Sequence, residues 1–324
     1  MLDLLIIGGS AAATSAGIYA ARRGLNFKII TKDFGGEVAT SGEIGNWPGD
    51  GVTDGLTLSD KFKKHLEHYK VDLEEGIEVE KITKQEDGTF CVTTKKEGST
   101  MAADKMEATP AGTAKCDYEA KVVIVTTGVH PRELNIPGEK EFRTKGVTYC
   151  TTCDGPLFAG KVTTVVGGGN SALEAALMLA DIASKVYVIN KNAAFKGDDV
   201  LIKNLTAKTD KVEIIYEAGT TQVVGEQFVT GIKYKDKDGN DKEIKTDGIF
   251  VHIGMVPNST IVPENAEKNP FGEIVVNAKC ETNVPGLYAA GDVTNVAFKQ
   301  IVIAAGQGTT ALLASVEYLN RLQK

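Results

Sequence analysis

Residues 4–21 read LLIIGGSAAATSAGIYAA, and residues 162–180 read VTTVVGGGNSALEAALMLA. Each stretch begins with an apolar run typical of a buried strand and continues through a Gly-rich turn into an Ala-rich run of helical character. A second β run follows each of them, at residues 27–31 and 186–190. Two such βαβ units predict an α/β fold with two doubly wound, Rossmann-like dinucleotide-binding domains.

The two Gly-rich turns match the dinucleotide fingerprint G-x-G-x-x-G/A to different degrees. Small residues are needed there because the backbone must approach a pyrophosphate that faces the helix N-terminus. In the second copy, Gly167, Gly169 and Ala172 fit the pattern. In the first copy, Gly8 fits and Ser10 replaces the middle glycine. The Ser10 side chain must therefore be accommodated, or must itself bond to the phosphate. One such turn alone could bind no ligand, but its duplication favours binding.

The order of the segments predicts that the second domain is inserted into the first. We expect a discontinuous first domain of residues 1–132 plus 247–324, and a second domain of residues 133–246 that carries the close cysteine pair. The later boundary follows a charged hairpin at residues 234–245. Residues 83–116 predict a small β meander with a long loop.

The composition is that of an ordinary soluble protein with room for two cores. The 324 residues include 36 Lys and Arg against 43 Asp and Glu, a net charge of −7. This balance gives no electrostatic footprint for nucleic acid or anionic lipid. No apolar run approaches the roughly 20 residues that span a bilayer. The first eight residues lack a basic segment and a cleavage site, so we expect a cytoplasmic protein.

The five cysteines are Cys91, Cys116, Cys150, Cys153 and Cys280. An odd count at wide spacing argues against a disulfide scaffold and favours a reducing compartment. Only Cys150 and Cys153 lie close together in the sequence, and we expect the other three to be ordinary half-buried residues.

The segment around Cys150 and Cys153 carries the most informative chemistry. Two cysteines three residues apart can close a disulfide where the chain turns, and such pairs often have a lowered thiol pKa. Asp154 could protonate the leaving thiolate, or could merely cap the following turn. Half of a zinc site is the alternative, but no second ligand pair of matching pattern is present. His65 and His68 are expected to face solvent.

With these motifs, the chain resembles low-molecular-weight thioredoxin reductases nearly from end to end. Residues 150–155, CTTCDG, are similar to that family's CATCDG, with Thr151 in place of alanine. A CxxCD motif between two nucleotide fingerprints excludes the larger disulfide reductases, whose redox cysteines lie near the N-terminus. The resemblance implies FAD as cofactor, thioredoxin or a thioredoxin-like protein as partner, two domains that rotate against each other, and a homodimer.

The resemblance also implies which residues bind FAD. Residues 35–38 are similar to the family's GGQL segment, residues 43–49 to its E-x-x-N-W/F-P-G segment, and residues 291–293 to its GDV segment. Lys299 stands where an arginine is usual, beside the isoalloxazine. The implied FAD-binding residues are Gly8, Gly9, Ser10, Ala11, Ala12, Thr31, Gly35, Gly36, Glu37, Val38, Asn46, Thr127, Gly128, Gly291, Asp292, Lys299, Gln300 and Ile301.

The same resemblance implies a catalytic cycle in which Cys150, Cys153 and Asp154 are the catalytic residues. Cys153 matches the cysteine nearest the flavin and receives the electrons. Cys150 matches the thiol that attacks the thioredoxin disulfide, and Cys153 then resolves the mixed disulfide.

The electron donor is where the family pattern breaks. The family carries H-R-R-x-x-F-R where residues 190–196 read NKNAAFK. Losing two charge-assisted arginine bonds weakens NADPH binding by roughly 10²- to 10⁴-fold. NADH favours an acidic residue at Asn190, which is neutral. Three donors stay open: NADPH bound weakly through Lys191 and Lys196, NADH bound loosely, or ferredoxin or a deazaflavin with a vestigial second site. The implied NAD(P)H-binding residues are Gly167, Gly169, Asn170, Ser171, Ala172, Lys191 and Lys196.

Rival functions share parts of this motif set. A flavoprotein dithiol oxidase would run the same chemistry toward oxygen, and the motifs do not separate the two directions. The ferredoxin/flavodoxin reductase branch of the fold lacks a CxxC motif, so Cys150 and Cys153 argue against it. A non-catalytic redox sensor would not need a full set of flavin-contacting residues.

Overall fold

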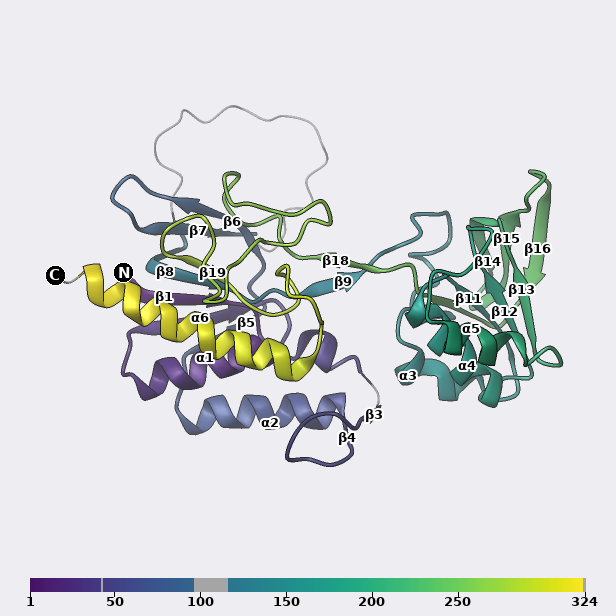
Figure 1. Ribbon diagram of the computed structural model, residues 1–324, viewed down its shortest axis with the longest axis horizontal. Helices are drawn as coiled ribbons and strands as arrows, with labels where there is room; N and C mark the ends of the chain where they lie inside the picture. The colour runs from purple at the N-terminus through teal and green to yellow at the C-terminus, as the bar shows by residue number, and fades with distance from the viewer. Residues whose placement is uncertain (42, 96–115, 323–324) are drawn as a thin grey trace. The chain divides into compact units, whose positions relative to one another are not determined.

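The computed structural model describes residues 1–41, 43–95 and 116–322 of the chain (Figure 1). The chain divides into two compact units. We call the first the terminal unit, because it joins Met1–His130 to Pro257–Lys324. The second, Pro131–Val256, is the inserted unit. Each unit contains a parallel sheet with helices packed on it, which confirms the predicted α/β fold class.

The terminal unit is built on a seven-stranded sheet in the order β5-β2-β1-β8-β7-β6, with β19 paired to β8. Strands β5, β2, β1, β8 and β19 run parallel, while β6 and β7 form an antiparallel meander on β8. The strands are β1 (Leu2–Ile7), β2 (Phe27–Thr31), β5 (Leu73–Glu75), β6 (Val79–Lys84), β7 (Phe90–Thr94), β8 (Tyr118–Val125) and β19 (Leu287–Ala289).

Alternating side chains of β1 divide between two cores. Leu4 and Ile6 pack with the small residues of helix α1, whereas Leu5 and Ile7 pack on the opposite face of the sheet. Helix α6 crosses close to α1 because residue 308 is glycine, where an added Cβ would lie 2.0 Å from the carbonyl oxygen of Ala12. The helices of this unit are α1 (Ala11–Arg22), α2 (Gly55–His68) and α6 (Ile301–Leu322), with the short 3₁₀ helix η1 (Gly36–Val38) and the hairpin of β3 (Glu43–Ile44) and β4 (Thr53–Asp54).

The inserted unit repeats the architecture on a smaller scale. Its five-stranded sheet is parallel throughout, in the order β10-β17-β11-β12-β13, and a three-stranded antiparallel sheet β14-β15-β16 belongs to the same unit. The elements are β10 (Val147–Thr148), α3 (Thr151–Asp154), η2 (Gly155–Phe158), β11 (Val162–Val166), α4 (Asn170–Ile182), β12 (Lys185–Ile189), α5 (Asp199–Thr206), β13 (Val212–Ile215), β14 (Gly219–Gly225), β15 (Val229–Lys235), β16 (Asp241–Lys245) and β17 (Gly248–Val251).

The second domain boundary lies later than the sequence suggested. The inserted unit extends to Val256, whereas residue 247 was expected to begin the return to the first domain. The reason is that β17 pairs with both β10 and β11 and is therefore a central strand of the inserted sheet. The two crossings between the units run through β9 (Val129–Pro131) and β18 (Met255–Pro257), which pair with each other.

Two further expectations concern turns and loops. The charged hairpin is present as β15 and β16, and Gly239 in its turn has the positive φ that favours glycine. The expected meander is present as β6 and β7, but the expected long loop falls on residues 96–115, outside the described residues.

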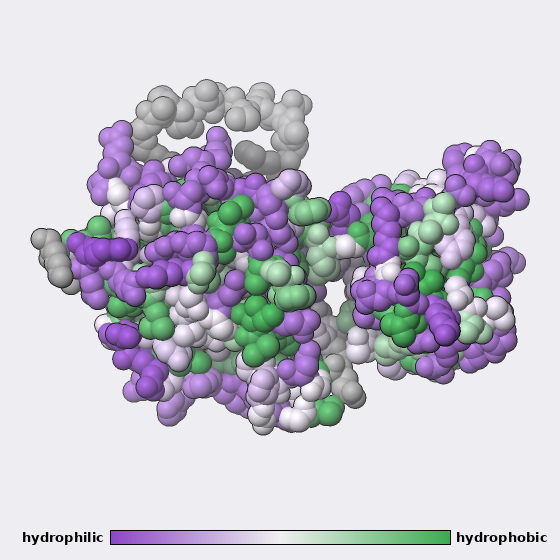
Figure 2. Space-filling model, viewed as in Figure 1, coloured by the Kyte–Doolittle hydropathy of each residue, from purple (hydrophilic) through white to green (hydrophobic). Residues whose placement is uncertain are grey.

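On the face shown in Figure 2, polar side chains are prominent on both units. Among the described residues, no helix has the length and apolarity needed to cross a membrane.

Candidate functional site

The first Gly-rich turn joins β1 to α1 and has no room for larger residues. Gly8 has a φ of 127°, and a Cβ there would lie 2.3 Å from the carbonyl oxygen of Thr126. A Cβ on Gly9 would lie 2.7 Å from the side chain of Thr31. The first N–H groups of a helix have no intrahelical acceptor, and Ser10 does not cap α1 with its side chain. The turn therefore offers backbone donors to an anion at the start of α1.

Ser10 is accommodated by a local hydrogen bond. Its hydroxyl donates to the carbonyl oxygen of Gly35 over 2.6 Å. The backbone of Gly35 in turn donates to the carbonyl oxygen of Gly9 over 2.7 Å. The serine that departs from the fingerprint therefore ties the first turn to the loop that follows β2.

Two other predicted FAD-binding residues lie where parallel strands of the terminal unit end. Thr31 ends β2, and Thr127 follows β8 with its hydroxyl donating to the carbonyl oxygen of Asn258 over 2.7 Å. Asn46 donates to the side-chain oxygen of Gln300 over 3.0 Å, which brings together two predicted residues 254 positions apart. Ligands of open α/β sheets bind at this edge.

Asp292 and Lys299 complete the terminal unit's candidate site. Burial raises the pKa of Asp292, and the nearby Lys299 ammonium partly offsets the rise. Lys299 itself bonds to Glu273 over 2.8 Å and to the carbonyl oxygens of Asp292 and Thr294. A Cβ added to the neighbouring Gly291 would lie 3.4 Å from the side chain of Ala12, so this segment lies against the start of α1.

These features fit FAD. A helix start with free backbone donors suits the pyrophosphate, and a half-buried acidic side chain beside it suits the hydroxyls of the ribityl chain. Gln307 was missed from sequence: its side-chain oxygen accepts from the backbone of Gly291 over 2.8 Å and fixes the Gly-Asp turn. It lies within an otherwise unremarkable helix, α6, so no sequence motif marks it.

The C-x-x-C segment follows β10 in the inserted unit. Cys150 is disulfide-bonded, and the backbone of Asp154 donates to the carbonyl oxygen of Cys150 over 3.1 Å. The side chain of Cys153 lies outside what the structure describes. Residues 151–154 form the single helical turn α3, which is the turn that the spacing of the two cysteines predicts.

Thr148 links Cys150 to Asp154 and was missed from sequence. Its hydroxyl donates to the Asp154 carboxylate, and the same oxygen accepts from the backbone N–H of Cys150 over 3.2 Å. Thr148 is buried, with 7% of its surface exposed. A hydroxyl two residues before a cysteine is too common in sequences to be a signal by itself.

Two more contacts hold this segment. The hydroxyl of Thr151 lies 2.7 Å from Nε2 of His252, and burial lowers the pKa of His252 to about 4. The hydroxyl of Tyr149 donates to the buried carboxylate of Glu139 over 2.8 Å. Burial of the Tyr149 hydroxyl, followed by this hydrogen bond and the negative charge of Glu139, raises the pKa of Tyr149. Glu139 also accepts the backbone N–H groups of Leu134 and Asn135.

The second Gly-rich turn is open where a pyrophosphate would lie. Gly167 has a φ of 152°, and its added Cβ would lie 2.1 Å from the carbonyl oxygen of His252 and 2.8 Å from the side chain of Ala172. Gly169 is the N-cap residue just before α4, and a Cβ there would meet nothing within 4 Å. Asn170 is engaged by the following loop, since its side-chain oxygen accepts from the backbone of Asp198 over 2.7 Å. Ser171 is exposed beside it.

The end of β12 carries the residues expected to discriminate between dinucleotides. Asn190 is buried and bonds to the backbone of Ala194 and Asn192, so its amide shapes the turn. A Cβ on Gly168 would lie 2.5 Å from that amide. Lys191 and Lys196 are exposed, and neither has an ion pair with another described residue. This turn lacks the arginine side chains that favour NADPH, and it also lacks the acidic residue that favours NADH.

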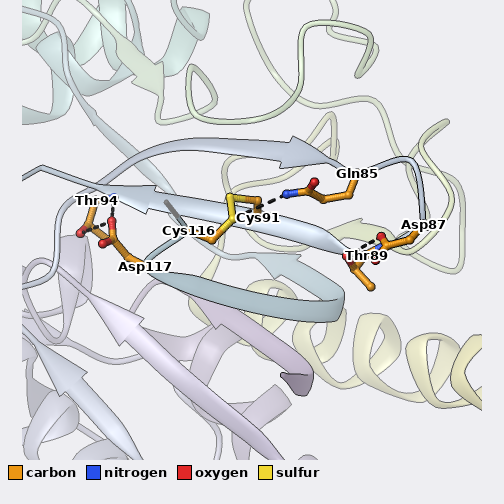
Figure 3. The surroundings of a disulfide bond; sticks show 7 residues. All are labelled: Gln85, Asp87, Thr89, Cys91, Thr94, Cys116 and Asp117. Atoms are coloured by element: carbon orange, nitrogen blue, oxygen red, sulfur yellow. Dashed lines mark hydrogen bonds between the residues drawn. A yellow bond between two sulfur atoms is a disulfide. The ribbon is translucent and has the colours of Figure 1, made fainter. Parts of the chain in front are cut away.

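One cysteine expectation is wrong. Cys91 and Cys116 form a disulfide with a Cα–Cα distance of 5.3 Å, within the usual range (Figure 3). Strand β7 carries Cys91, and Cys116 lies just before β8, its neighbour in the sheet. The wide spacing hid this pair because the antiparallel pairing of β7 with β8 brings the two cysteines together. The cysteine pattern therefore does not support the inference of a reducing compartment. Cys280 is a free thiol, but it is fully buried where a half-buried residue was expected.

Comparisons with known proteins give this geometry a family context. The family described as Pyridine nucleotide-disulphide oxidoreductase matches residues 2–308. A subunit of the alkyl hydroperoxide reductase of Pseudomonas putida is 40% identical over 321 residues, which cover 98% of this chain and 58% of that protein. NADH dehydrogenase of Bacillus subtilis strain 168 is 37% identical over 320 residues, covering 98% and 59%. The chain thus spans less than two thirds of the length of these relatives.

A solved structure gives the same context for the fold. Thioredoxin reductase of Lactococcus lactis superposes with a TM-score of 0.79 at 27% identity and covers 99% of this chain and 100% of that one. The expected similarity to thioredoxin reductases is therefore confirmed at the level of structure.

Proposed function

The chain belongs to the Pyridine nucleotide-disulphide oxidoreductase family, and we propose that it reduces the disulfide of a thioredoxin or thioredoxin-like protein. It is an oxidoreductase with FAD as cofactor. The observation that carries the proposal is the oxidised Cys150, held beside the Asp154 carboxylate by the hydroxyl of Thr148.

In this proposal Cys153 is the disulfide partner of Cys150. Bound FAD would supply the two electrons that reduce their bond. Asp154 is placed in the turn that carries both cysteines, where its carboxyl group can deliver a proton to a departing thiolate. The residues implied for FAD by the sequence are proposed to hold it at the carboxyl edge of the terminal unit's sheet.

The substrate step uses only the two thiols. The thiolate of Cys150 attacks one sulfur of the substrate disulfide, forming a mixed disulfide and expelling the other substrate sulfur as a thiolate. The thiolate of Cys153 then attacks the sulfur of Cys150. This step restores the Cys150–Cys153 disulfide and releases the second substrate thiolate.

We propose NADH as the electron donor, bound at the second Gly-rich turn. The open space at Gly169 and the free start of α4 support a dinucleotide there. The lost arginine forks disfavour the 2′-phosphate of NADPH, and a relative that covers 98% of the chain is named NADH dehydrogenase. The exposed Lys191 and Lys196 offer the 2′-phosphate of NADPH only point charges, without the paired hydrogen bonds of an arginine.

Anaerobic titration of the flavin-loaded protein tests the donor. One equivalent of NADH should bleach the visible flavin band, whereas NADPH should need a concentration at least tenfold higher. Bleaching by reduced ferredoxin alone, with neither dinucleotide active, would overturn the assignment of the second turn as a dinucleotide site.

A Cys153→Ser variant tests the disulfide route. It should keep its flavin and lose thioredoxin reduction, and normal turnover by this variant would disprove the route.

A second candidate substrate comes from the relatives. The Pseudomonas putida relative is named a subunit of alkyl hydroperoxide reductase, so a disulfide of a peroxide-reducing partner is an alternative to thioredoxin. The two substrates are compared in one assay, with NADH oxidation followed in the presence of each. If kcat/KM is higher with the peroxide-reducing partner, that partner replaces thioredoxin as the proposed substrate.

Size-exclusion chromatography tests the homodimer that the resemblance implies.

A further inference from the structure

His252 stands on a rigid part of the inserted unit. It directly follows β17, the strand between β10 and β11, and its backbone N–H donates to the carbonyl oxygen of Val166 over 2.8 Å. Its own carbonyl lies so close to Gly167 that no Cβ fits between them. The position of this histidine is therefore set by the parallel sheet and by the second Gly-rich turn.

The C-x-x-C turn meets this histidine through one side chain. Strand β10 pairs with β17 in a register that matches Thr148 with Phe250, so the segments that leave the two strands stay side by side. Thr151, the first residue of α3, is 5% exposed, and its hydroxyl is 2.7 Å from Nε2 of His252. The two residues are 101 positions apart in the chain.

We infer that the Thr151–His252 hydrogen bond is a positioning contact that holds the C-x-x-C turn closed and so favours the disulfide over the dithiol. The inference rests on the proposed role of Cys150 and Cys153 as the redox pair. A disulfide demands that two cysteines stay within a narrow range of separations, whereas two thiols do not. A contact that fixes the turn between them therefore stabilises the oxidised form more than the reduced form.

The contact acts through geometry and adds no charge to the site. Burial lowers the pKa of His252 to about 4, so the imidazole is neutral near pH 7. A neutral imidazole does not draw a thiol toward its thiolate form as a cationic one does. The measurement that reports the contact is therefore the disulfide–dithiol equilibrium.

The test compares two substitutions at one position. Thr151→Val removes the hydroxyl and keeps the shape, while Thr151→Ser keeps the hydroxyl. Flavin-loaded protein is equilibrated in dithiothreitol redox buffers, the thiols are trapped by alkylation, and the peptide holding residues 150 and 153 is quantified by mass spectrometry. This readout excludes the Cys91–Cys116 pair and needs no turnover.

We expect Thr151→Val to lower the equilibrium constant for disulfide formation by about three- to tenfold, or about 15–30 mV toward a less negative potential. Thr151→Ser should stay close to wild type. Thr152→Val is the matched control, since Thr152 is the exposed neighbour in the same turn. His252→Ala should give the same shift as Thr151→Val, and the double variant should add nothing further.

Several results would overturn the inference. These are a Thr151→Val equilibrium within twofold of wild type, equal shifts in Thr151→Val and Thr151→Ser, or additive effects of Thr151→Val and His252→Ala. If Thr151→Val loses its flavin or its fold, His252→Ala carries the test alone. A protein that shows the expected shifts but reduces no disulfide substrate would refute the proposed function and leave this contact established.

Discussion

Thr148 donates a hydrogen bond to the carboxylate of Asp154 while it accepts one from the backbone of Cys150. One buried hydroxyl thus fixes both the start of the C-x-x-C turn and the acidic side chain that ends it. Such a link orients a proton donor relative to the sulfur that leaves, and orientation of this kind governs how well general acids work.

Replacing Asp154 with asparagine should slow disulfide reduction by about 10²-fold, since a positioned general acid contributes at least that much. Thr148→Val should lower kcat by roughly fivefold with little change in KM, because the carboxylate is kept but no longer held. Thr148→Ser should restore the rate. The assay is NADH-dependent reduction of an aromatic disulfide. Asp181→Asn is the control, because Asp181 is exposed in the same unit and pairs with Lys208. An Asp154→Asn enzyme with more than half of the wild-type rate would remove Asp154 from the mechanism.

The missing arginines lead to a gain-of-function prediction. Lys191→Arg with Asn192→Arg restores two guanidinium forks after β12 and should tighten NADPH binding by about 10²-fold through charge-assisted bonds. NADH has no 2′-phosphate, so its affinity should change less than threefold. Both affinities are read from flavin bleaching in anaerobic titrations. Lys203→Arg, a substitution on helix α5, controls for a guanidinium group placed away from the end of β12. Equal gains for both dinucleotides would mean that residues 191 and 192 do not face the 2′ position.

The Cys91–Cys116 disulfide should stabilise the terminal unit by closing a loop between residues 25 apart. Loop-closure entropy predicts about 3–4 kcal/mol, or roughly 6–15 °C in Tm for a unit of this size. Cys91→Ser with Cys116→Ser should show this loss in differential scanning calorimetry. Dithiothreitol should lower the Tm of the wild type and of Cys150→Ser alike, and should leave the double variant unchanged. A reductant effect that disappears in Cys150→Ser would place the stabilising bond at the other pair.

The sequence predicted what is local and missed what depends on strand register. The Gly-rich turns at Gly8 and Gly167 were readable because a strand, a turn and a helix follow one another within a short stretch. The contact of Thr151 with His252 depends on how β10 pairs with β17, which no local pattern contains. The boundary at Asp247 was misplaced for a related reason, because an apolar run does not reveal which sheet it joins.

Register also explains the missed disulfide. Cys91 lies in β7 opposite Glu119 of the antiparallel strand β8, and Cys116 lies two residues before β8 begins. Gln85 adds a contact from the same meander, with its amide 3.6 Å from the sulfur of Cys116 (Figure 3). Predicting the meander was possible, but its register decides whether two such cysteines face each other. The spacing of cysteines in the sequence carries no information on that point.

The buried imidazole of His252 should make stability fall with acidity in a defined range. Its folded pKa of about 4 lies below its ordinary value of 6.5. Below pH 6.5 the unfolded chain therefore binds a proton that the folded chain does not bind until about pH 4, so stability is lost as the pH falls through this range. Titration of His252 should therefore lower the free energy of unfolding by about 2 kcal/mol between pH 7 and pH 5.

Urea denaturation at pH 7 and pH 5, followed by circular dichroism, checks this in matched variants. The loss between the two pH values should be about 2 kcal/mol smaller in His252→Gln than in the wild type, because glutamine does not titrate. His65→Gln removes an exposed histidine from helix α2 and should behave like the wild type. If His252→Gln loses as much stability as the wild type, the imidazole titrates near its ordinary pKa. It would then be charged in part of the working range, and the Thr151 contact would act on Cys150 through charge as well as through geometry.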